Sequence, residues 1–140
     1  MARNARIDKL GTDWASLAMG AGIGLTIALQ ATTMRSSDFR DTYQWLDTIA
    51  RTCALLGTYF SLAGVLLVAR IPWVERGVGH DRLVTWHRKL APYSLFLIGF
   101  HVLLVLIGYA GEEHVPLYSQ MWKLLTQYPW MTWALLGFYL

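Results

Sequence analysis

Long apolar stretches separated by short polar segments dominate the chain. Mostly apolar residues run over about 14–33, 49–69 and 90–110, and a further run of 11 residues covers 130–140. A helix rises about 1.5 Å per residue, so about 20 apolar residues cross a hydrocarbon core of about 30 Å. The pattern therefore predicts an all-α, polytopic transmembrane helical bundle with three complete spans and the first half of a fourth.

Composition supports a membrane protein over a soluble one. The 140 residues are 55% hydrophobic and 15% charged, against about a quarter charged in a typical soluble domain. The lipid bilayer is thus the first expected partner. The net charge of +3 is small and does not indicate nucleic acid. Because the last apolar run covers only about half a bilayer, we expect the sequence to be part of a longer protein.

Lysine and arginine are unevenly distributed between the segments that flank the spans. Three precede the first span, at Arg3, Arg6 and Lys9, and five lie between residues 70 and 89, whereas the other two connections carry two and one. Basic segments stay on the cytoplasmic side. We therefore expect the amino terminus inside, the third span running from inside to outside, and a multi-pass protein of the cell membrane.

Glycines in the first apolar stretch predict close helix packing. Gly20 and Gly24 lie four residues apart, and small residues at this spacing let another helix approach closely in lipid.

Two histidines, one within the third apolar stretch and one just before it, are the main candidates for chemistry. His101 lies near the middle of that stretch, where an ionisable side chain is costly and usually serves a site. His87 lies 14 residues earlier, which is about 3.9 helical turns and about 21 Å of rise. Two imidazoles so placed point the same way to within about 40° and can hold two separate cofactors, for which haem is a suitable group. The alternative is a pair of neutral histidines that hydrogen-bond a neighbouring helix.

The residues around these histidines allow more than one interpretation. Ala91, Ser94, Ile98 and Gly108 share their face and could leave room for porphyrin edges, although ordinary packing explains them equally well. Pro92 would bend a helix that began before His87, or would fit the first turn of a helix that begins near Leu90.

Charged residues near the span ends are weaker candidates. Arg88 and Lys89 follow His87 and could pair with haem propionates, but they also fit the distribution of basic residues. Arg51 could extend its charge to the membrane interface, or it could meet a haem propionate or an anionic electron acceptor. His80 and His114 are expected in exposed loops, and His114 with Glu112 and Glu113 could instead gather a metal-ion substrate.

The segment from Asp81 to Leu90, followed by His101, resembles the third membrane helix of the ferric-reductase-like transmembrane domain family. That family includes ferric-chelate reductases, NADPH oxidases and bacterial flavin-linked relatives, and its helix carries two histidines at this spacing. The flanks Ile71–Arg76 and Gly108–Ala110 resemble bacterial members, which implies a bacterial plasma membrane.

The resemblance implies six helices, two stacked b-type haems and a cytoplasmic module that binds FAD and NAD(P)H. Electrons would pass from NAD(P)H through FAD to an inner haem on His87, then to an outer haem on His101 and to an acceptor outside. The second histidine pair of the family lies on its fifth helix, beyond this sequence. We therefore expect the second haem ligands, the remaining helices and the flavin domain outside this chain, which should not be active alone.

Two other functions fit the same pattern. The chain could be the cytochrome b anchor subunit of a respiratory dehydrogenase, with a separate soluble partner. It could also be a non-catalytic helical membrane scaffold or a transporter fragment whose histidines are merely packed.

Overall fold

A computed structural model describes residues 2–139, with side chains for residues 11, 13–36, 39–134 and 136–137. Over residues 2–139 it contains helices and no strand. The elements in chain order are α1 (Ala2–Thr33), the 3-10 helix η1 (Ser36–Phe39), α2 (Thr42–Val68), α3 (Pro72–Val78), α4 (His80–Glu112), α5 (Leu117–Gln127) and α6 (Pro129–Tyr139).

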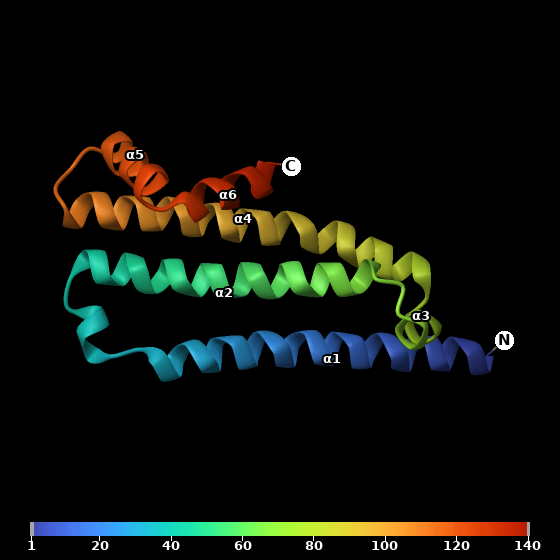
Figure 1. The fold of residues 1–140 in the computed structure, drawn as a ribbon. Coiled ribbons are helices and arrows are strands. Elements are labelled where there is room, and N and C mark those ends of the chain that lie inside the picture. Colours follow the sequence, from blue (N-terminus) through green and yellow to red (C-terminus); the bar gives the residue numbers. More distant parts are fainter. Residues whose placement is uncertain (1, 140) are drawn as a thin grey trace.

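Three long helices lie side by side, with α2 between α1 and α4 (Figure 1). Each is long and apolar enough to cross a membrane, over Asp13–Thr33, Thr42–Val68 and His80–Glu112. Large apolar side chains point outward, for example Leu25 at 62% and Phe96 at 69% exposure. Apolar surface of this extent indicates contact with lipid. The predicted polytopic helical bundle is confirmed.

The start of α4 settles the question raised by Pro92. The helix begins at His80, ten residues before Leu90, and continues through Pro92. The idea that a helix begins near Leu90 is therefore wrong, and His87 lies within regular helix. The break comes earlier, at Gly79, whose φ of 90° is a conformation that glycine adopts readily. Figure 1 shows the first turns of α4 inclined to the rest of the helix, as an internal proline favours.

Two short helices, α3 and α5, lie in segments that the sequence pattern presents as polar connections. Pro72 occupies the first turn of α3, a position where its missing N–H costs nothing. At the other end of the bundle, α5 follows α4 and packs on it, and α6 follows α5 (Figure 1). The 11 residues of α6 fall where a fourth span was predicted to begin.

The first helix makes its close contact at a different glycine from those predicted. A Cβ on Gly20 or Gly24 would meet nothing within 4 Å in the described chain, whereas one on Gly22 would collide with the ring of Tyr59 on α2. The Tyr59 hydroxyl donates a hydrogen bond of 2.9 Å to the Met19 carbonyl. The packing role predicted for Gly20 and Gly24 is thus wrong within this chain. The side chains of Arg3, Arg6 and Lys9 lie outside the described residues.

Candidate functional site

The site is built on the contact between α2 and α4, which repeats every seven residues. On α2 the buried small residues Ala50, Gly57 and Gly64 follow one another at this interval. On α4 the residues opposite them are His101, Ser94 and His87, in reverse order because the helices are antiparallel. A seven-residue repeat is that of a left-handed helix pair, in which residues seven apart keep facing the partner.

Each of the three α4 side chains hydrogen-bonds a backbone carbonyl of α2. His87 Nδ1 lies 3.0 Å from the Gly64 oxygen, and His101 Nδ1 lies 2.8 Å from the Ala50 oxygen. Because a carbonyl oxygen only accepts, both Nδ1 atoms must carry the hydrogen and donate it. The repeat therefore gives both imidazoles the same hydrogen bond to α2, at positions separated by two seven-residue repeats of α4.

Between the histidines, a pair of serine hydroxyls completes this contact. Ser94 is only 5% exposed, and its Oγ donates to the Gly57 oxygen at 3.1 Å. The same Oγ accepts from the hydroxyl of Ser61, whose oxygen also lies 3.0 Å from the Gly57 oxygen; because a hydroxyl has one hydrogen, Ser61 donates to only one of these two oxygens at a time. Every polar atom of this buried pair thus has a partner, as burial in lipid requires.

Gly57 is a point of close approach between the two helices near the middle of their contact. A Cβ there would lie 2.8 Å from Ile98 Cγ1 and 3.3 Å from Leu97 Cβ, so a side chain fits only if α4 moves. At Gly64 a Cβ would lie 3.5 Å from His87 Nδ1, an ordinary contact. Glycine therefore lets the carbonyls of α2 come within hydrogen-bonding distance of α4.

The second nitrogen of each histidine is available for a ligand. Among the described residues, neither Nε2 receives a hydrogen bond, and both side chains are half-buried. In the neutral imidazole whose Nδ1 donates, Nε2 carries a lone pair. A histidine that donates Nδ1–H to a carbonyl and offers Nε2 is the usual form of a metal ligand. The donor set therefore fits haem iron, although a packed histidine would need the same Nδ1 bond.

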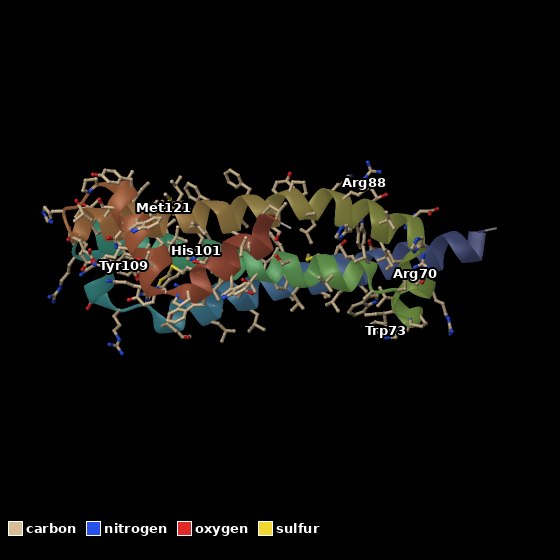
Figure 2. All side chains as sticks on the ribbon, turned by 45° about the horizontal axis from the view of Figure 1, so that its top comes forward. Arg70, Trp73, Arg88, His101, Tyr109 and Met121 are labelled. Atoms are coloured by element: carbon tan, nitrogen blue, oxygen red, sulfur yellow. The ribbon has the colours of Figure 1, made fainter. Side chains whose placement is uncertain are left out.

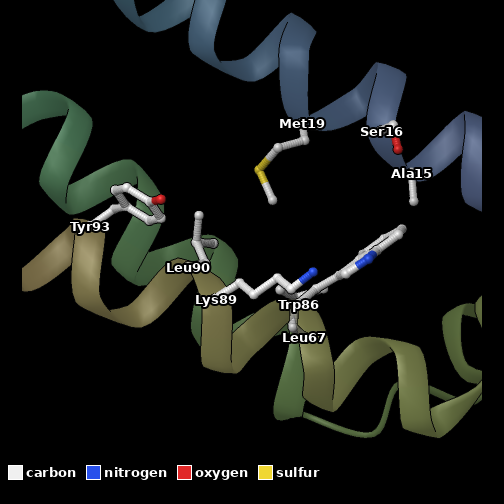
Figure 3. Close-up of a pocket in the computed structure, with 8 residues that line it drawn as sticks. All are labelled: Ala15, Ser16, Met19, Leu67, Trp86, Lys89, Leu90 and Tyr93. Carbon is white, nitrogen blue, oxygen red and sulfur yellow. The ribbon is translucent and has the colours of Figure 1, made fainter.

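Arg88 and Lys89 lie on different sides of α4. Arg88 is exposed and points away from the helix pair (Figure 2). Lys89 is also exposed, but its side chain extends into a groove between α4 and α1 (Figure 3). Neither takes part in an ion pair within the described part of the chain.

The remaining candidates do not join the two histidines. His80 is the first residue of α4, 3.6 Å from Glu75, and so does not lie in a free loop. His114 is exposed, and its Nδ1 lies 3.1 Å from the Glu112 carbonyl oxygen. Glu113 binds Lys123 at 2.6 Å instead. No group of three or more metal-ligating side chains occurs among the described residues, so the structure does not gather these carboxylates into a metal site.

Arg51 forms an ion pair with Asp47, one helical turn earlier on α2. Both residues line a groove of about 270 Å³ beside Leu104 and Gly108, beyond His101 on α4. The groove is the polar end of the α2–α4 contact.

Sequence reasoning missed the half of the site that lies on α2. Ala50, Gly57 and Gly64 stand seven and 14 residues apart, the same intervals that separate His101, Ser94 and His87. Matching intervals of small and polar residues on neighbouring spans are a signal that could have paired the two helices.

The comparison with known families was informative for most of the chain. A family model described as "Ferric reductase like transmembrane component" matches residues 53–140, which is more than half of the sequence. The match takes in His87, His101 and the glycines of α2. No curated protein and no solved structure matches the chain.

Proposed function

Because this chain belongs to the ferric-reductase-like transmembrane family, we propose that it carries electrons across the membrane from cytoplasmic NAD(P)H and FAD to an acceptor outside. Family membership makes it a component of a membrane oxidoreductase.

Two b-type haems are assigned to this path, with His87 as a ligand of the inner haem and His101 as a ligand of the outer one. A haem at each position supplies a one-electron redox centre when bound. The second ligand of each comes from a further helix of the full-length protein. Arg88 and Lys89, next to His87, are the candidates for charge-assisted hydrogen bonds to its propionates.

The residues of this chain orient the two ligands. The carbonyls of Gly64 and Ala50 accept from Nδ1, which fixes the tautomer and turns Nε2 away from α2. The seven-residue repeat places the imidazoles on one side of α4, about 21 Å apart along its axis.

The observation that carries the proposal is that both histidines make the same contact: each has its Nδ1 hydrogen-bonded to a backbone carbonyl of α2. A packing role needs only one donated hydrogen bond per side chain, as Ser94 has at the middle of the same repeat. A metal ligand needs in addition a nitrogen with a lone pair, and both rings offer Nε2 on the same face of α4.

The test is an absorption spectrum of the full-length protein, purified in detergent, recorded as dithionite-reduced minus oxidised. We expect a b-type spectrum with two haems per chain, and His87→Ala and His101→Ala should each lose about one. His114→Ala removes an exposed imidazole outside the α2–α4 contact and is the matched control, which should keep both.

Retention of all haem in both variants would show that these histidines are not ligands. A protein without haem would support the scaffold or transporter alternative. A haem-containing protein whose coding sequence lacks a flavin domain would instead indicate an anchor subunit of a respiratory dehydrogenase.

A further inference from the structure

The groove between α1 and α4 is apolar with one positive charge, and it has no role in the proposed electron path. It holds about 350 Å³, within the range of small-molecule sites. Its walls are Ala15, Ser16 and Met19 of α1 and Trp86, Lys89, Leu90 and Tyr93 of α4, with Leu67 of α2 between them. Apart from Lys89, the lining consists of apolar, aromatic and small side chains.

The groove exists because α1 packs on α2 and α3 but not directly on α4 in the described chain. At one end α3 closes the gap, where Gly11 of α1 meets Gly77 so closely that a Cβ on Gly11 would collide with the Gly77 carbonyl. Figure 3 shows Met19 and Ala15 facing Trp86 across the opening. Within a bilayer, an apolar recess of this kind has to be filled by an apolar chain.

Lys89 gives the groove a preference for negative charge. Its ammonium extends toward Trp86 and has no carboxylate partner among the described residues (Figure 3). The groove lies at the end of the bundle that carries the basic segment 70–89, the end expected to be cytoplasmic. Basic pockets between membrane helices on that side bind the headgroups of anionic lipids.

We propose that this groove binds an anionic phospholipid, with an acyl chain between Met19 and Trp86 and the phosphate on the Lys89 ammonium. The site does not depend on haem. Since one ammonium cannot serve both a lipid phosphate and a haem propionate, the assignment leaves Arg88 for the inner haem.

Trp86 can report the lipid directly, because bromine atoms on an acyl chain quench a neighbouring indole. The full-length protein is placed in phosphatidylcholine vesicles that contain a small fraction of brominated phosphatidylglycerol or brominated phosphatidylcholine, with bromines near the headgroup. The chain has seven tryptophans. The Trp86 signal is therefore the difference between the protein and its Trp86→Phe variant.

We expect brominated phosphatidylglycerol to quench Trp86 at about one-fifth of the concentration that brominated phosphatidylcholine needs, the effect of one lysine near the surface. Lys89→Gln should remove this difference and Ala15→Leu, which narrows the groove, should weaken quenching by both lipids. Lys123→Gln, at the opposite end and paired with Glu113, should change neither.

Equal quenching by the two lipids, or none by either, would overturn the assignment. So would a Lys89→Gln variant that keeps the lipid preference but loses haem, since its ammonium would then serve a propionate.

Discussion

The contacts of α2 with its two neighbours are built in different ways. Toward α4, backbone carbonyls at Ala50, Gly57 and Gly64 accept three hydrogen bonds at regular intervals. Toward α1, the Tyr59 hydroxyl donates to the Met19 carbonyl and also lies 3.5 Å from Met19 Sδ, beside one glycine. The hydrogen bonds between α2 and α4 recur along much of both helices, whereas the contact between α2 and α1 is formed at one place.

The difference has a physical basis in the lipid environment. Apolar side chains gain little by associating in hydrocarbon, so close packing of small residues and interhelical hydrogen bonds decide which helices associate and in which register. A repeated set fixes the register of α4 on α2 and hence the positions of His87 and His101. The local contact at Tyr59 holds α1 near α2 but leaves a groove beside α4.

The largest effect is expected when a glycine is replaced by leucine at the contact of α2 with α4 and the result is compared with the same replacement on α1. Gly57→Leu inserts a side chain where α2 and α4 approach closely, since even a Cβ there would lie 2.8 Å from Ile98. Overpacking of this kind costs about 1–3 kcal/mol. It should also move both histidines from their acceptors, so we expect lower stability in detergent unfolding and loss of both haems.

Gly20→Leu is the control, because a Cβ on Gly20 meets nothing within 4 Å in the described chain. It should change unfolding by less than about 0.5 kcal/mol and leave haem content intact. If the two leucine variants have the same stability and haem content, the contact of α2 with α4 tolerates a large side chain as well as the surface of α1 does.

Hydropathy predicted the three long helices, depth in the apolar run selected His101, and the spacing of 14 residues selected His87, because all three features depend on the local sequence alone. The start of α4 was harder to predict. Residues 80–89 are polar enough to suggest a loop, and the conformation of Gly79 that ends α3 is not encoded in a pattern. Similarly, α5 lies in a segment whose charges and short length hide a helix.

The acceptors on α2 could not be predicted in the same way. They are backbone atoms, so no residue type marks them, and their role depends on which helix lies opposite and in which register. Gly20 and Gly24 show the limit of a short motif: their spacing suits close packing, yet in this chain the contact forms at Gly22.

A smaller effect is expected from the serine pair at the centre of the α2–α4 contact. Ser94→Ala removes its hydrogen bonds to Gly57 and Ser61 while adding no bulk. At about 0.6 kcal/mol for an average hydrogen bond between membrane helices, the loss should be about 1 kcal/mol. Denaturant titration in mixed micelles measures it, and both haems should remain bound.

Ser119→Ala is a suitable reference, since Ser119 lies on α5, outside this contact. A Ser94→Ala protein as stable as the Ser119→Ala protein would mean that the central hydrogen bonds contribute nothing and that Gly57 alone sets the register.

The smallest effect should come from the contact of α2 with α1. Tyr59→Phe removes the one hydrogen bond to the Met19 carbonyl and keeps the ring beside Gly22, so the expected loss is about 0.6 kcal/mol. Haem content should be unchanged, because the histidine acceptors lie on the other side of α2. The informative measurement is the Trp86 fluorescence in brominated vesicles, since α1 forms one wall of the groove. Increased quenching with unchanged haem would show that α1 and α4 move independently, whereas a loss of haem would show that the hydrogen bond of Tyr59 also supports the register of α4.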